Sequence, residues 1–127
     1  MPEPEPSPDV LPGEPISRHC RNSSHIAGGG RVKYSAFMPP PNGRLSVVRS
    51  DGLATQEVEA IGRQFVHADV KGHATLMAEA FLTRNLQFDP NGEPFSRHAN
   101  VFNWHDDDAR NRLIATALAS ASVLNKY

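Results

Sequence analysis

The chain has 127 residues, a formal net charge of −1, 39% hydrophobic residues and 21% charged residues. This length suits one domain and is too short for two domains with separate cores, and the composition is that of a globular rather than a disordered chain. The near-neutral charge argues against a general nucleic-acid binder, because neutralising phosphates requires a positive excess.

Two further features indicate the compartment. Cys20 is the only cysteine, so no disulfide can form within the chain and the fold depends on its core. The N-terminus lacks the basic start and apolar run of a secretory signal, and no apolar stretch is long enough to span a bilayer. We therefore expect a cytoplasmic protein that does not act in a membrane.

Residues 1–15 (MPEPEPSPDVLPGEP) hold six of the eleven prolines together with four acidic residues and no basic residue. Alternating Pro and Glu removes backbone donors and fixes φ, which favours an extended tail. We predict a disordered leader over residues 1–15 and a single domain over 16–127. An inert solubilising role for the leader is favoured over a docking arm for a basic or aromatic groove.

The first elements of the domain are predicted as a hairpin followed by a helix. Residues 31–37 (RVKYSAF) alternate like a strand, the Pro- and Gly-containing segment 39–43 is typical of a turn, and residues 44–49 (RLSVVR) form a second apolar run. Apolar residues then recur at helical spacing over roughly 55–66, with Thr55 as a possible cap. Gly62 weakens this helix by about 1 kcal/mol relative to alanine.

The second half of the chain alternates between strands and a final helix. Residues 74–81 (ATLMAEAF) suit a buried strand or a short helix, and we favour the strand. Further strands are expected at 85–88 (NLQF) and 98–104 (HANVFNW). After Asp106–Asp108, an apolar stripe predicts a C-terminal helix; its members are Leu113, Ile114, Ala117, Leu118, Ala121 and Leu124.

These elements predict an α+β fold. We expect a small, mostly antiparallel sheet of four or five short strands, with two helices on one face and the C-terminal helix as the main cover.

Chemistry-bearing side chains gather first at Arg18, His19, Cys20 and Arg21. Two guanidinium groups beside an imidazole could bind a phosphate or a nucleotide pyrophosphate. A solvated edge strand with ordinary charges is the favoured alternative. Cys20 as a nucleophile has less support, because no partner base is identifiable and a buried inert thiol is the commoner case.

A second polar cluster comprises Arg97, His98, Asn100 and His105. His98 follows a polar turn at the start of a predicted strand and could act as a general base, with Asn100 two residues later on the same face. A histidine satisfied by a neighbouring carbonyl is the favoured alternative. The run from His105 to Asp108 has the composition of a metal site, but a helix start explains its aspartates, and we predict no metal and no cofactor.

Part of the sequence resembles small uncharacterised bacterial proteins with the pattern S-x-A-F-x-P…G-x-L-S-V-x-R. The similar segments are 35–39 (SAFMP), which lacks the residue between Ser and Ala, 43–49 (GRLSVVR), 89–94 (DPNGEP) and 98–101 (HANV). The resemblance covers residues 18–104 with gaps and brings no established activity. It draws attention to Ser46, Arg49 and His98.

Two classes of function follow. The favoured one is a small cytosolic accessory or protein-interaction module that acts with a larger bacterial partner. The alternative is a small transferase or hydrolase acting on a nucleotide or RNA phosphate, with His98 as the catalytic base and Arg18, His19, Ser46 and Arg49 binding the ligand. For this alternative we expect His98 and the Arg18–His19 pair to share one surface. The sequence leaves the oligomeric state open.

Overall fold

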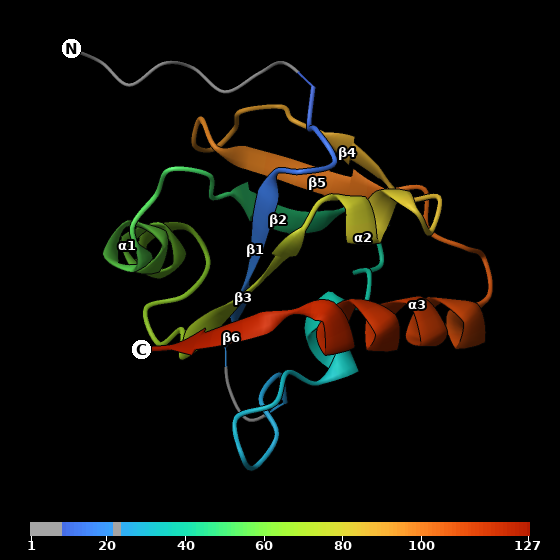
Figure 1. Ribbon diagram of the computed structural model, residues 1–127, viewed down its shortest axis with the longest axis horizontal. Coiled ribbons are helices and arrows are strands. Elements are labelled where there is room, and N and C mark those ends of the chain that lie inside the picture. The colour runs from blue at the N-terminus through green and yellow to red at the C-terminus, as the bar shows by residue number, and fades with distance from the viewer. Residues whose placement is uncertain (1–8, 22–23) are drawn as a thin grey trace.

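The computed structural model describes residues 9–21 and 24–127, so the first eight residues of the predicted leader lie outside the described part (Figure 1). The elements follow one another as β1 (Pro15–Cys20), the 3-10 helix η1 (Tyr34–Phe37), β2 (Leu45–Arg49), α1 (Thr55–Phe65), β3 (Gly72–Met77), α2 (Glu79–Leu82), β4 (Gln87–Asp89), β5 (His98–Phe102), α3 (Asp108–Ala121) and β6 (Val123–Lys126).

All the strands of the described chain join one antiparallel sheet in the order β4-β5-β2-β1-β3-β6. The predicted α+β class and antiparallel pairing are confirmed. The number of elements was underestimated, because the described residues form six strands and three α-helices rather than four or five strands and two helices. The strand β1 lies in the interior of the sheet, so the solvated edge strand considered for residues 18–21 is wrong.

The two faces of the sheet differ in chemistry because successive strand residues point to opposite sides. One face, here called the core face, carries the apolar residues that pack against η1, α2 and α3. Its buried members are Ile16, Cys20, Leu45, Val47, Ala74, Leu76, Ala99 and Val101. The other, here called the polar face, carries Ser17, His19, Ser46, His73, Thr75, His98, Asn100 and Asn125.

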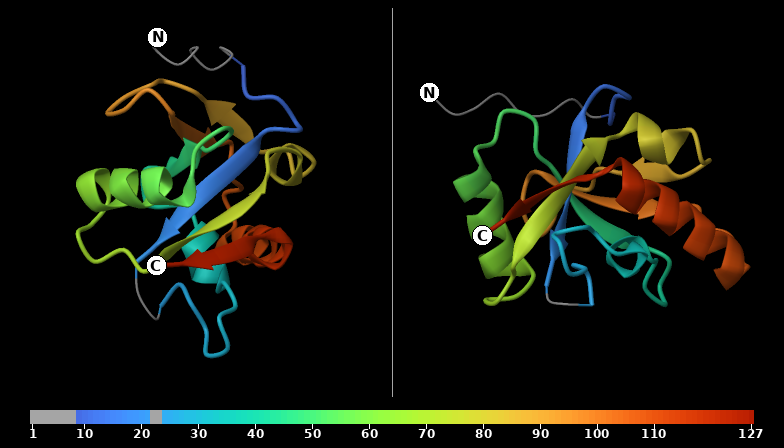
Figure 2. Two further views of the ribbon diagram at one scale, coloured as in Figure 1. Left: turned by 60° about the vertical axis from the view of Figure 1, so that its left-hand side comes forward. Right: turned by 60° about the horizontal axis from the view of Figure 1, so that its bottom comes forward.

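Helices cover both faces rather than one. Figure 2 shows α1 on one side of the central strands and α3 on the other. Val58 of α1 is buried, and its carbonyl oxygen lies 2.7 Å from Nε2 of His19 on the polar face. The expectation of two helices on one face is therefore wrong, because α1 packs on the polar face and buries His19 there.

Residues 31–37 do not form the predicted strand. Val32 makes only an isolated bridge with Ile26, and residues 34–37 turn into η1, which buries Ala36 and Phe37 against the core. The Arg18 guanidinium stabilises this turn by donating to the Ala36 carbonyl at 2.8 Å. The strand β2 consequently pairs with β1 and β5, and the predicted hairpin does not exist.

The later segments agree with the predictions in part. Residues 74–77 belong to β3, as expected, but the chain then turns into α2. The helix α3 forms and contributes Ala115, Leu118 and Ala119 to the core, whereas Leu113 is 72% exposed. Leu124 lies beyond the helix end, on β6. The buried face of α3 is thus shifted from the predicted stripe: Leu118 belongs to both, but Ala115 and Ala119 take the place of Leu113.

Gly62 lets α1 approach the polar face. A Cβ atom placed there would lie 2.4 Å from Cδ2 of His19, a ring already held by the Val58 carbonyl. We expect Gly62→Ala to lower the free energy of unfolding by up to about 2 kcal/mol, because overpacking costs about 1–3 kcal/mol and the gain in helix propensity offsets only about 1 kcal/mol. Chemical denaturation measures this change. A stabilised variant would contradict the close packing of His19 against α1.

Candidate functional site

A chain of hydrogen bonds joins Ser46 on β2, His98 on β5 and Asn91 in the turn before β5. The Ser46 hydroxyl lies 2.7 Å from Nε2 of His98, and Nδ1 of the same ring lies 2.8 Å from Oδ1 of Asn91. The strand register explains the first contact. Ser46 pairs with Asn100 and Val48 pairs with His98, so Ser46 and His98 lie diagonally across neighbouring strands on one face.

The hydrogen bonds determine the tautomer of His98. The backbone N–H of Glu93 donates to Oδ1 of Asn91 at 3.3 Å, which identifies that atom as the amide oxygen. An amide oxygen only accepts, so Nδ1 of His98 must carry the proton and donate it to Asn91. The unprotonated Nε2 therefore accepts a hydrogen bond from the Ser46 hydroxyl.

The surroundings of His98 keep its imidazole neutral. The residue is buried, and burial lowers the pKa of His98, although the nearby Asp89 carboxylate opposes this. The Phe95 ring packs edge-on against the imidazole with ring centroids 5.3 Å apart, and Phe95 also contacts Phe65 of α1. The turn before β5 is thus held over the polar face by one aromatic residue and by Asn91.

Arg18 does not share a surface with His19. The two are neighbours on β1 and point to opposite faces of the sheet. The Arg18 guanidinium donates to the carbonyl oxygens of Ala36 and Ser46, at 2.8 and 3.0 Å, from the core face. Arg18 therefore reaches the backbone of Ser46, while His98 binds the side chain of Ser46 on the polar face.

Arg49 is buried in an ion pair with Glu14. Its Nε donates to Oε1 of Glu14 at 2.6 Å and its Nη2 donates to Oε2 at 3.0 Å, a two-point contact. Burial raises the pKa of Glu14, but the hydrogen bonds from Arg49 and the Leu11 N–H, together with the positive charges of Arg49 and Arg97, outweigh it, and the pKa lies below its usual value. Glu14 falls within the predicted leader and nevertheless binds a residue of the sheet.

His19 and Cys20 are both enclosed. Burial lowers the pKa of His19, and the Val58 carbonyl and the neighbouring Arg18 act on it in opposite directions. Burial raises the pKa of the Cys20 thiol to about 11, so this side chain lacks the thiolate character of a nucleophile.

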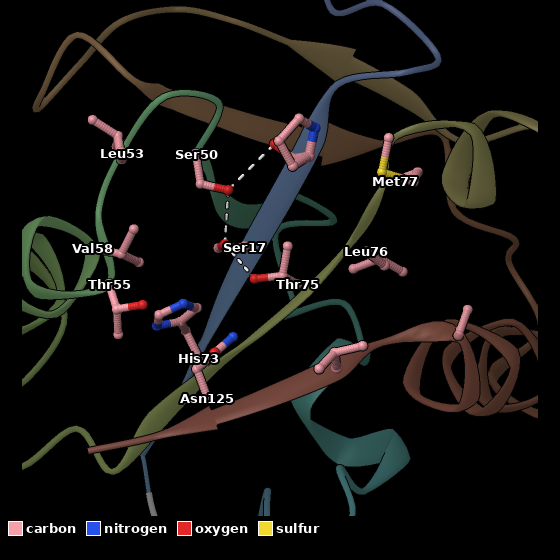
Figure 3. Close-up of a pocket in the computed structure, with 13 residues that line it drawn as sticks. Ser17, Ser50, Leu53, Thr55, Val58, His73, Thr75, Leu76, Met77 and Asn125 are labelled. Atoms are coloured by element: carbon pink, nitrogen blue, oxygen red, sulfur yellow. Dashed lines mark hydrogen bonds between the residues drawn. The ribbon is translucent and has the colours of Figure 1, made fainter.

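A cavity of about 540 Å³ opens on the polar face between the start of α1 and the strands β1, β3 and β6 (Figure 3). Its floor carries a relay of hydroxyl groups in which Ser17 lies 2.8 Å from Ser50 and 2.9 Å from Thr75. His73 and Asn125 also line it. Burial lowers the pKa of His73 to about 4, so this ring is neutral near pH 7.

A second cavity of about 580 Å³ lies between residues 27–34 and the C-terminal half of α3. It is lined by Ser122 and Leu124, whereas the first cavity is lined by Val123 and Asn125. Because these residues alternate, the two cavities flank β6 on opposite faces of the sheet.

The segment after His105, whose composition is that of a metal site, forms the start of α3. The aspartates after His105 serve the helix start, since Asp107 is the N-cap of α3 and its side chain accepts from the Ala109 N–H at 2.9 Å. In the described ranges, no three His, Cys, Asp or Glu side chains converge as metal ligands. No helix in that same part of the chain has the length and apolar character to cross a bilayer.

Several residues of these sites carried no signal in the sequence. Asn91 stands in a segment with ordinary turn composition, where an asparagine is expected for local reasons. The hydroxyl-bearing strand residues Ser17 and Thr75 belong to no motif, and only the register of β1 with β3 brings them together.

Comparison with protein-family models, curated proteins and solved structures finds no match to this chain.

Proposed function

We propose that this protein is a protein-interaction module that binds an extended segment of a partner chain along β6. The observation that carries this proposal is the position of β6 at the end of the sheet with an open cavity on each of its faces. An end strand presents unpaired backbone groups to which another strand can add.

The cavities supply what an added strand needs for specificity. Backbone hydrogen bonds give affinity in this mode of binding, and pockets for alternate side chains distinguish one partner from another. Apolar surface is also exposed beside β6, where Val123 is 67% and Met77 is 47% exposed. Both residues line the first cavity, so a partner segment would cover them.

The linings of the two cavities define the chemistry of the segment. The cavity on the polar face has hydroxyl, amide, imidazole and apolar groups but no Asp, Glu, Lys or Arg among its lining residues. The opposite cavity includes Arg31 and Lys33, both exposed. The matching segment therefore alternates uncharged side chains with acidic ones.

The alternative of an enzyme acting on nucleotide or RNA phosphates has less support. Phosphate binding needs guanidinium or ammonium groups that can reach a ligand. Arg18 donates hydrogen bonds to two backbone carbonyls, and Arg49 forms an ion pair with Glu14. Arg18 and Arg49, which were expected to bind the ligand, thus hold parts of the protein together.

A selection from a library of random 12-residue peptides tests the interaction proposal. We expect the enriched peptides to alternate acidic and uncharged residues, and a bound peptide to shift the amide NMR signals of Val123–Lys126. Lys33→Glu should weaken binding by about 10-fold, since it places like charges together.

Arg110→Glu provides the matched control, because Arg110 is an exposed residue of the first turn of α3 and lines neither cavity. It makes the same change in net charge and should leave the affinity nearly unaltered. Equal losses in the two variants, or signal shifts confined to β4 at the opposite edge, would contradict the proposed site.

A further inference from the structure

We infer that Ser46, His98, Asn91 and Asn100 form an acyl-transfer site, separate from β6, that cleaves small uncharged esters through Ser46. Nothing in the proposed binding at β6 requires this activity. It is inferred from hydrogen bonds that link a hydroxyl, a base and an orienting group, and from the strand register that sets a carbonyl-polarising amide beside the hydroxyl.

The first three residues have the geometry of an activated nucleophile. The serine hydroxyl donates to Nε2, and the opposite ring nitrogen donates to the Asn91 oxygen, so the base is oriented by a third group. The 2.7 Å distance between Ser46 and His98 falls in the range required for proton transfer between nucleophile and base, and the 2.8 Å hydrogen bond to Asn91 holds the base in orientation. Glu93 donates to the same asparagine oxygen and fixes the orienting group in turn.

Asn100 supplies the polarising group. It is the direct cross-strand partner of Ser46, and such partners have Cβ atoms about 4.5–5.5 Å apart. Its side-chain amide makes no hydrogen bond to other residues of the described chain, so the amide N–H can donate to a ligand. A side-chain amide beside the nucleophile can stabilise the oxyanion that forms when the nucleophile attacks a carbonyl.

The charges around Ser46 favour an uncharged substrate. Arg44, the residue just before β2, is paired with Asp89 at 3.1 Å, and Asp89 pairs with Asn100 across the strands. The local charge is thereby balanced and offers neither a phosphate-binding cation nor a site for an ammonium group. An ester carbonyl needs only the hydroxyl, the base and the amide.

The reaction proceeds in two balanced steps. Ser46 Oγ forms a bond to the carbonyl carbon while its proton moves to Nε2 of His98, and Asn100 stabilises the oxyanion. The ester C–O bond then breaks, and Nε2 returns the proton to the departing alkoxide, which leaves as an alcohol. Water, deprotonated by the same nitrogen, next attacks the acyl group and releases a carboxylic acid, with the proton returned to Ser46.

Labelling with a fluorophosphonate, which reacts with activated serines, tests this inference on the full chain. Intact-mass spectrometry should show one adduct, located on Ser46 by peptide mapping, and Ser46→Ala should remain unlabelled. The native protein should also hydrolyse p-nitrophenyl acetate faster than Ser46→Ala. His98→Gln should slow labelling at least about 100-fold, as expected for loss of a general base.

Asn91 provides a second test if His98→Gln fails to fold, because Asn91 is exposed and its replacement leaves the imidazole in place. Asn91→Ala should slow labelling about 10-fold and Asn91→Asp should restore it, since aspartate also accepts from Nδ1. Ser96→Ala, an exposed serine of the same turn, is the control and should label like the native protein. Absence of an adduct on Ser46 in the folded native protein would overturn the inference, as would equal labelling of Asn91→Ala.

Discussion

Replacing Glu14 by glutamine is expected to lower the free energy of unfolding by about 3–5 kcal/mol, the loss typical of a buried ion pair that loses one partner. Arg49 has only 3% of its side chain exposed and Glu14 only 11%. Without the carboxylate, the guanidinium stays charged in a site closed to water, because its pKa is too high for deprotonation. Urea denaturation of the native protein and the variant measures the difference.

Glu59→Gln is the control for this experiment. Glu59 pairs with Arg63 at 2.9 Å on α1, but 43% of the arginine and 33% of the glutamate side chain is exposed. Surface pairs of this spacing contribute only about 0.3–0.5 kcal/mol. Similar small losses in both variants would mean that Arg49 does not depend on Glu14.

The stabilisation that Glu14 gives to the folded native protein should also decline in acid. Its folded-state pKa is below the ordinary value, so the unfolded chain binds a proton more readily. The ion-pair contribution is complete above the unfolded pKa and disappears as the pH falls through the lower folded pKa.

The sequence correctly predicted those helices and strands whose apolar residues recur at regular spacing within one continuous segment. The helix over residues 55–66, the strand 44–49 and the strand beginning at His98 all formed, as the apolar spacing indicated. The strand predicted for residues 31–37 did not form, because tertiary contacts determine the conformation of this segment. Phe37 enters the core from a 3-10 turn that Arg18 holds in place.

The central strand β1 was the hardest element to foresee. Its sequence PISRHC mixes polar and apolar residues, which is typical of an edge, yet it lies inside the sheet. The polar residues are tolerated because each finds a partner. Ser17 joins the hydroxyl relay, His19 binds a helix carbonyl and Arg18 binds two carbonyls.

The candidate site was partly visible in the sequence. Ser46 and His98 stood out through the resemblance pattern, and the structure places their side chains in hydrogen-bond contact. Asn100 was grouped with His98 from the sequence, but its pairing with Ser46 depends on strand register. Asn91 carried no signal, because its contact with His98 depends on how the turn folds back. Register between distant strands is a property of the whole sheet.

Leu118→Ala is expected to lower the free energy of unfolding by about 2–5 kcal/mol, the range for removing a large side chain from a closed core. Leu118 is fully buried and packs in the cluster between α3 and the core face of the sheet. A loss of this size is a large fraction of the stability of a small domain.

Leu113→Ala is the matched control, because Leu113 lies on the same helix with 72% of its surface exposed and should change stability by no more than about 0.5 kcal/mol. Thermal and urea unfolding of both variants give the comparison, and a change below about 1 kcal/mol for Leu118→Ala would show that α3 does not anchor the core.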